Sequence, residues 1–214
     1  MAKRRNITGA ILAGGKSSRM GQDKALLELN SKPFIRHVAE VLLDVFQRVI
    51  IIADHGEPYR FLGLPIYKDA FTQCGPLAGI HSALTHAHTD AVFITSCDVP
   101  FLTPAIIRYV IKPKVRNEVT LVAGGNSLQP LCGLYTQNCL PTIERHLQRG
   151  QYSVLQCLHD LKTTILSPSF VLTAYAPHPL TNINTPDDYR RCLGEVSARG
   201  LRVEEFNTRD DFHS

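Results

Sequence analysis

Near its N-terminus the chain reads Leu12-Ala13-Gly14-Gly15-Lys16-Ser17-Ser18-Arg19-Met20-Gly21-Gln22-Asp23-Lys24. This loop follows an apolar run of strand type, Ile7–Ala13. It combines three glycines, two hydroxyls and three cations. Glycine lets backbone N–H groups approach phosphate oxygens, and Arg or Lys neutralises their charge, so this composition predicts a polyphosphate site. A solvated basic turn is the alternative, but it does not require so many glycines and cations together.

Two common nucleotide motifs do not fit the loop. A Walker A loop needs a glycine five residues before the glycine of Gly15-Lys16-Ser17, and that position is Ala10. The pattern Gly-x-Gly-x-x-Gly is also absent. GTPase switch chemistry and Rossmann-type dinucleotide binding are therefore disfavoured.

Around this loop, short aliphatic runs alternate with helical patterns, which indicates a parallel sheet built from βαβ units. The runs are Ile7–Ala13, Val49–Ala53, Leu64–Tyr67, Ala91–Ser96 and Glu118–Ala123. They are apolar on both faces, as expected of strands that helices cover on both sides. Pro33–Phe46 and Pro76–His86 carry apolar stripes at helical spacing, and each begins with a proline, which the first helical position tolerates.

Beyond Ala123 the rhythm changes. A turn at 124–127 precedes a predicted strand of different direction, Gln129–Tyr135, and the rest is expected to contain helices at Leu140–Gln148 and Ser153–Leu161, a strand near Val171–Tyr175 and a final helix from Pro186. The prediction is an α/β protein: a single three-layer α/β/α sandwich with a mostly parallel sheet and a mixed second half. We assign residues 1–199 to this domain and 200–214 to a polar tail whose order the sequence leaves open.

Composition bounds the class of protein. With 214 residues, 44% hydrophobic and 20% charged, the chain is typical of globular proteins and unlike disordered, collagenous or coiled-coil ones. The longest unbroken apolar stretch, Val49–Ala53, is far short of the roughly 18–20 residues that cross a bilayer, so no membrane partner is expected. The net charge is +4 and the basic residues are scattered, which argues against nucleic acid and for a small polyanionic ligand.

The six cysteines include no C-x-x-C pair, and a chain of this length needs no disulfides. Reduced thiols in the cytoplasm are therefore expected. Lys3-Arg4-Arg5 before Ile7 superficially resembles a signal peptide, but the apolar region is short and broken by glycine, which suits a strand entering a ligand loop better.

The loop closely resembles the signature of the nucleotidyltransferases, specifically the molybdenum cofactor guanylyltransferases. Three further segments resemble this family in the same order: Gly75-Pro76-Leu77-Ala78-Gly79, Cys97-Asp98-Val99-Pro100 and Asn182-Ile183-Asn184-Thr185-Pro186. The likeness spans roughly Ile7 to Tyr189. It implies a fold like that of the nucleotide-diphospho-sugar transferases, and transfer of GMP from GTP to the terminal phosphate of molybdopterin with release of pyrophosphate.

Asp98 is the expected magnesium ligand. It follows the strand Ala91–Ser96, and open α/β sheets bind ligands at the carboxyl ends of their strands. Helix capping is the alternative role, but Thr103-Pro104 already supplies a cap and a first-turn proline for the next helix. A carboxylate facing a triphosphate needs a divalent cation between them, and the resemblance also implies Mg²⁺ here.

Other site residues are less strongly marked. Asp69 follows the strand Leu64–Tyr67 and compares with a family aspartate that contacts the nucleotide, although a plain loop carboxylate explains it equally. The glycine-rich helix start at Gly75-Pro76 has free N–H groups for a base or a phosphate. The segment Thr185-Pro186-Asp187-Asp188 has the residues of a helix start, so capping accounts for it. Capping does not account for the two asparagines before it, Asn182 and Asn184. By resemblance, Asn184 assists Asp98 with the metal and Asn182 binds the acceptor.

Together these expectations define a Mg²⁺-dependent enzyme. Arg19, Lys24 and Asp98 are the predicted catalytic residues, and GTP is expected to bind at Leu12, Ala13, Gly14, Gly15, Lys24, Asp69, Gly75, Pro76 and Asp98. A phosphate nucleophile is ionised at neutral pH, so charge neutralisation matters more than a general base. His81, His86 and His88 lack the spacing of a metal site. Expected partners are GTP, molybdopterin and proteins that deliver the acceptor or receive the product; the alternatives are a cytidylyltransferase, a sugar-phosphate nucleotidyltransferase and a non-catalytic nucleotide-binding protein.

Overall fold

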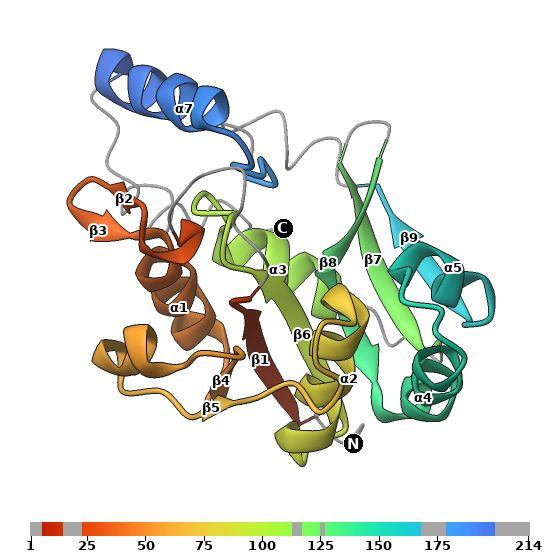
Figure 1. The fold of residues 1–214 in the computed structure, drawn as a ribbon. Helices are drawn as coiled ribbons and strands as arrows, with labels where there is room; N and C mark the ends of the chain where they lie inside the picture. The colour runs from red at the N-terminus through yellow and green to blue at the C-terminus, as the bar shows by residue number, and fades with distance from the viewer. Residues whose placement is uncertain (1–5, 15–22, 113–116, 125–126, 168–178, 200–214) are drawn as a thin grey trace.

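A computed structural model of the chain describes residues 6–14, 23–112, 117–124, 127–167 and 179–199 (Figure 1). The predicted strand near Val171–Tyr175, the tail 200–214 and the loop residues 15–22, which include Gly15 and Arg19, lie outside the described residues.

The centre of the molecule is a seven-stranded sheet with the order β5-β4-β1-β6-β8-β7-β9. Its strands are β1 (Ile7–Leu12), β4 (Val49–Ile52), β5 (Ile66–Tyr67), β6 (Ala91–Ser96), β7 (Val119–Gly124), β8 (Ser127–Thr136) and β9 (Thr163–Leu166). The first four are parallel, and β7 and β9 run in the same direction. Among these strands β8 is the reversed one, antiparallel to both β6 and β7. The prediction of a mostly parallel sheet with a mixed second half is confirmed.

Helices cover both faces of the sheet, because side chains of each strand alternate between two apolar cores. Ile11, Ile51 and Phe93 face α1 (Phe34–Val45) and α3 (Pro104–Ile111). Ala10, Ile50 and Val92 face the other layer, formed by α2 (Gly75–Ala87), α4 (Leu140–Gln148) and α5 (Val154–His159). This arrangement is the predicted three-layer sandwich.

A third, smaller apolar core lies beyond the carboxyl ends of the strands. It consists of Leu27, Leu29, Phe34, Phe101, Ile183, Cys192 and Val196, with Tyr189 packed against it, and we call it the third core. The hairpin β2 (Glu28–Leu29) and β3 (Lys32–Pro33) borders it, and the C-terminal helix α7 (Pro186–Arg199) covers it (Figure 1). Sequence reasoning placed α7 but missed the hairpin, whose two-residue strands are too short to show a period.

Most predicted elements agree with the structure to within one or two residues. The strand expected at Leu64–Tyr67 begins only at Ile66. Its Pro65 has no N–H to donate to the ladder, although the Pro65 carbonyl accepts a bond from Ile51 N at 2.9 Å. The short edge strand β9 was not predicted. Among the described helices, none combines the length and the apolarity that a membrane span requires.

Candidate active site

The candidate site lies where β1 and β6 end side by side. From β1 the chain proceeds to β4 and β5 on one side of the sheet, and then crosses back to β6 on the other side of β1. Such a switch of direction leaves a crevice at the carboxyl ends of the two strands, which is the usual ligand site of open α/β sheets. Gly14 follows β1 and Asp98 follows β6, so the topology brings both predicted residues to this edge.

The backbone after β1 is held by its neighbours up to Ala13, which is buried, and becomes exposed at Gly14. Ala13 N donates to Ile52 O at 2.9 Å, and the Leu12 carbonyl accepts from Cys97 N at 3.3 Å. The Leu12 side chain packs on Gly79 of α2, where an added Cβ would lie 3.1 Å from Leu12 Cδ1. Gly14 is exposed, and a Cβ placed on it would meet no heavy atom of the described residues within 4 Å. A ligand can therefore approach this backbone closely.

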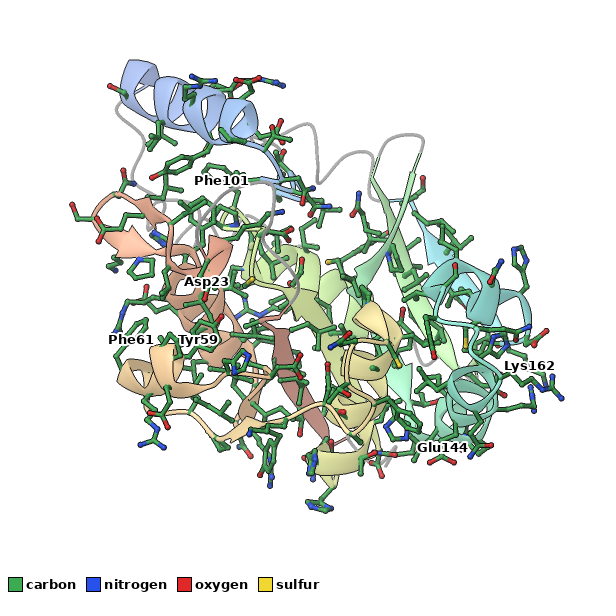
Figure 2. All side chains as sticks on the ribbon, viewed as in Figure 1. Asp23, Tyr59, Phe61, Phe101, Glu144 and Lys162 are labelled. Carbon is green, nitrogen blue, oxygen red and sulfur yellow. The ribbon has the colours of Figure 1, made fainter. Side chains whose placement is uncertain are left out.

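Lys24 and Asn184, far apart in the sequence, meet at this edge. Lys24 Nζ donates a hydrogen bond to Asn184 Oδ1 at 2.8 Å. The preceding Asp23 anchors the segment, because its carboxylate accepts from Ala25 N at 3.0 Å and from the buried Tyr59 hydroxyl at 2.6 Å (Figure 2). Burial and the Asp23 carboxylate raise the pKa of Tyr59 above its usual range, so this hydroxyl keeps its proton.

Asp98 is tied to its surroundings through both its side chain and its backbone. Ser96 Oγ donates to Asp98 Oδ1 at 2.5 Å, and the Asp98 carbonyl accepts from Ile183 N at 3.0 Å. The cap of α3 is Thr103, whose hydroxyl accepts from Ile106 N. The expectation that Asp98 is not needed as a cap is confirmed. Ser96 was not singled out from the sequence, although its position two residues before Asp98 at a strand end was the available signal.

The loop before α7 divides into a capping part and a part that faces the site. Thr185 and Asp188 form a capping box, with Asp188 N donating to Thr185 Oγ1 at 3.1 Å and Thr185 N donating to Asp188 Oδ2 at 3.0 Å. These hydrogen bonds lower the pKa of Asp188. Capping leaves the asparagine side chains for other contacts: Asn184 meets Lys24, and Asn182 Nδ2 lies 3.5 Å from Gln129 Oε1 of β8.

Asp69 follows β5 and carries an unusual carboxyl group. Its Oδ1 is buried and has no hydrogen-bond partner among the residues that the structure describes. Burial raises the pKa of Asp69, and the nearby Asp54 carboxylate raises it further, while a hydrogen bond with the Ser82 hydroxyl opposes the rise. Gly75, at φ +69°, begins α2, and both Gly75 and Pro76 are exposed there. Left-handed backbone of this kind favours glycine.

Two of the histidines on α2, His81 and His86, have structural contacts. His81 is buried with Nε2 3.2 Å from Glu144 Oε1, and His86 stacks on Tyr67 with ring centroids 4.3 Å apart. Within the described ranges, no group of three or more His, Cys, Asp or Glu side chains is arranged to hold a metal. All six cysteines are free.

A depression of about 470 Å³ lies at the opposite end of the strands, lined by residues that include Asn6, Asp90 and Gln137. Hydrogen bonds already engage its polar groups, because Asn6 N donates to Asp90 and Gln137 Nε2 donates to the Leu84 and Thr89 carbonyls. We therefore place the candidate site at the carboxyl edge.

Comparison with known proteins agrees with this fold. Residues 9–163 match the MobA-like NTP transferase domain. A probable molybdenum cofactor guanylyltransferase of Carboxydothermus hydrogenoformans is 38% identical over 189 residues, which cover 88% of this chain and 95% of the relative. A crystal structure of a putative protein from Aquifex aeolicus is similar with a TM-score of 0.73 and 32% identity, covering 86% of this chain and 96% of that one.

The structure of molybdopterin-guanine dinucleotide biosynthesis protein A from Archaeoglobus fulgidus has a TM-score of 0.77 at 23% identity, covering 91% of this chain and all of that one, and it supports the fold. Because the family match spans most of the sheet and the bacterial relative aligns over nearly its whole length, the chain belongs to the MobA-like NTP transferases, the family of the molybdenum cofactor guanylyltransferases.

Proposed function

We propose that this protein is a cytoplasmic guanylyltransferase, with residues 1–199 as its nucleotidyltransferase domain, which transfers GMP from GTP to the terminal phosphate of molybdopterin. The observation that carries the proposal is the meeting of Lys24, Asp98 and the 182–184 loop at the switch point of the sheet. Relatives named as molybdenum cofactor guanylyltransferases, 38% identical in the case above, support the choice of substrates.

In the proposed reaction, an oxygen of the acceptor phosphate attacks the α-phosphorus of GTP in line. A new P–O–P linkage forms, the bond from the α-phosphorus to the bridging oxygen breaks, and pyrophosphate leaves with that bond's electron pair. The nucleophile is already ionised, so the protein has to neutralise charge and align the groups. The structural contacts of His81 and His86 fit such a site, which needs no general base.

We assign the nucleotide to the groups along the carboxyl edge. The backbone at Leu12, Ala13 and Gly14, which is exposed at Gly14, would with Gly15 approach the phosphates, and Lys24 and Arg19 would neutralise them. Asp69 and the helix start at Gly75-Pro76 would contact the nucleoside. The unpartnered Asp69 Oδ1 supports this assignment, because a buried acceptor without a donor is costly and a ligand N–H or O–H would satisfy it.

The residues present fit a magnesium ion. Mg²⁺ prefers oxygen ligands, keeps several waters and is usually held by one or two protein groups together with substrate phosphates. Asp98 supplies a carboxylate and Asn184 an amide oxygen, and the Asp98–Ile183 backbone bond holds the two segments together. When bound, Mg²⁺ would supply charge neutralisation at the phosphates. Asn182, beside Gln129, would contact the acceptor.

The Lys24–Asn184 hydrogen bond cannot persist if Lys24 binds a phosphate and Asn184 binds the metal. Its ammonium group now occupies Asn184 Oδ1 at 2.8 Å, the oxygen that we assign to the metal. We infer that Lys24 exchanges Asn184 for a phosphate oxygen when triphosphate binds. The exchange is favoured because a phosphate oxygen offers Lys24 a charge-assisted hydrogen bond in place of one to a neutral amide, and the bond to Asn184 is exposed.

Incubating the protein with each nucleoside triphosphate, Mg²⁺ and molybdopterin, and measuring pyrophosphate, tests the proposal. Of the four nucleoside triphosphates, only GTP is expected to release pyrophosphate in the presence of Mg²⁺ and molybdopterin. Release from CTP would indicate a cytidylyltransferase, and release that depends on a sugar phosphate would indicate a sugar-nucleotide enzyme. Binding of nucleotide without pyrophosphate under any condition would show a nucleotide-binding protein without this activity.

A further inference from the structure

The third core touches each of the three segments that meet at the site. Leu27 lies three residues after Lys24, Phe101 lies three residues after Asp98, and Ile183 separates the two asparagines. All three are buried, with 4%, 1% and 0% of their surface exposed. Figure 2 shows Phe101 directly beneath α7. The site segments therefore share one apolar anchor.

Helix α7 closes this core from outside. Cys192 and Val196 are buried in it. Tyr189 fastens the start of the helix to the hairpin that follows Lys24: its hydroxyl donates to the Glu28 carbonyl at 2.7 Å, and its ring meets Phe34 edge-on at 5.9 Å. Movement of α7 would therefore disturb the hairpin and the 182–184 loop together.

Polar contacts link the same segments on the site side. Lys24 bonds Asn184, and Ile183 N bonds the Asp98 carbonyl. The three segments are thus joined by hydrogen bonds on one side and by the third core on the other. Small packed units of this kind open locally at lower free energy than large cores, so breaking a hydrogen bond on one side weakens the packing on the other.

We propose that α7 is a positioning element of the active site, with Tyr189 as the positioning residue that sets Lys24, Asp98 and Asn184 relative to one another through the third core. The catalytic consequence rests on the proposed function. The coupling between α7 and the Lys24–Asn184 bond does not, because it is a property of the chain without ligands.

The coupling can be measured through Cys192. This thiol is buried, and burial raises its pKa to about 12, so it is protected from N-ethylmaleimide in the closed state. It should react only when α7 opens. Asn184→Ala removes the bond to Lys24 and is expected to speed native-state alkylation of Cys192 about threefold or more, read by peptide mass spectrometry. Cys157, a buried thiol of α5 with a pKa of about 11, is the internal control and should react at its wild-type rate.

An unchanged Cys192 rate in Asn184→Ala would overturn the proposal. Equal acceleration of Cys157 would overturn it too, because it would show general destabilisation instead of coupling through the third core. Neither result depends on whether the protein uses GTP.

The catalytic arm compares Tyr189→Ala and Tyr189→Phe with Leu193→Ala, a change at a 39% exposed position of the same helix. Well below the melting temperature, Tyr189→Ala should lower kcat about tenfold while KM for GTP changes less, because misalignment acts on the reacting groups more than on nucleotide capture. Tyr189→Phe keeps the ring and should recover most of the rate. Leu193→Ala should match wild type.

A purely structural role would lower the melting temperature of Tyr189→Ala and leave its kcat per folded molecule unchanged, and that result would overturn the proposal. If Tyr189→Ala does not fold, Tyr189→Phe decides through Cys192, whose alkylation should be about threefold faster once the bond to Glu28 is removed. A wild-type protein that releases no pyrophosphate from GTP would refute the proposed function and leave the alkylation test in place.

Discussion

Lys24, Asp98 and Asp23 each have a side-chain partner at the carboxyl edge, namely Asn184, Ser96 and Tyr59. Asp69 differs, because one of its oxygens is buried with no partner within the described part of the chain and its pKa is raised. A side chain that destabilises the free protein is expected at a binding site, where the ligand supplies its missing hydrogen bond. At the scale of single residues, Asp69 is therefore the position where stability and binding are expected to conflict.

We expect Asp69→Asn to stabilise the free protein at neutral pH. The pKa of Asp69 is raised in the folded state, mainly by burial, so the folded protein binds this proton more tightly than the unfolded chain. Stability then falls as pH rises through the folded pKa, and the ionised carboxylate is a cost above it. Urea unfolding should show the gain at pH 7 and none near pH 3, where both states are protonated.

Asp160→Asn is the matched control for this experiment. Its hydrogen bond with His146 lowers the pKa of Asp160, so the sign is reversed: ionised Asp160 favours the folded state, and the substitution should destabilise it at pH 7. A destabilised Asp69→Asn at neutral pH would contradict the assigned cost of that carboxylate.

Asp98→Asn should keep the shape of the site and remove the charge assigned to the metal. Loss of metal stabilisation by several kcal/mol corresponds to a drop in kcat of about 100-fold or more, since each 1.36 kcal/mol is tenfold. Binding of GTP without metal should change much less. Titrating Mg²⁺ against the rates of both proteins measures the effect, with Ser96→Ala as a variant that keeps the carboxylate and removes its 2.5 Å partner.

An Asp98→Asn protein with an unchanged rate and unchanged Mg²⁺ dependence would exclude Asp98 as the ligand. Asp69 would then be the next candidate, ahead of Asp23, whose two oxygens are engaged by Ala25 N and the Tyr59 hydroxyl.

Strand β8 packs so closely against β7 that one of its positions, Gly133, has no room for a side chain. Its pairing with β7 shifts between Leu121, opposite Gly133, and Val122, opposite Gln129. At Gly133 the strands approach so closely that an added Cβ would lie 2.4 Å from Leu121 Cδ2 and 2.8 Å from the Thr120 carbonyl. Because one of these atoms belongs to the backbone, the clash cannot be relieved by a side-chain rotation alone.

Gly133→Ala should therefore destabilise the protein by about 1–3 kcal/mol, the usual cost of overpacking. Gly194→Ala in α7 is the matched control, because a Cβ there meets no heavy atom within 4 Å in the described ranges. In a helix interior this change should stabilise by about 0.5–1 kcal/mol. Thermal melts of the two variants should shift in opposite directions, and a common sign would contradict the close approach at β8.

For the whole molecule, the site draws its residues from segments that are distant in the sequence, so occupancy should stabilise the complete fold. A ligand at 100 times its Kd adds about 2.7 kcal/mol, which for a chain of this size raises Tm by roughly 5–10 °C. GTP with Mg²⁺ should produce this shift, and ATP, CTP and UTP should produce smaller ones. Lys24→Ala should show a smaller shift than wild type at equal GTP.

A melt that does not respond to GTP would contradict the nucleotide assignment, and a larger shift with CTP would favour cytidylyl transfer. Calorimetric competition among the four nucleotides is an independent check.

The amino-acid sequence alone determined those features that depend on residues close together in the chain. Apolar runs identified the central strands, Thr103 and Thr185 were recognised as helix caps, and the position of Asp98 after β6 was read from the chain. These features follow from local periodicity and capping, which a short window contains. Family resemblance added the guanylyltransferase chemistry, and the comparisons confirmed the family.

Only the tertiary structure decided which distant segments meet. The sequence placed Lys24 and Asn184 in separate motifs, and the fold joined them across 160 residues by a 2.8 Å hydrogen bond. The edge position of β9 and the burial of Ile183 with Phe101 under α7 likewise appeared only in three dimensions. The physical reason is that strand order and the packing of small cores depend on the burial of the whole chain, which no local pattern encodes.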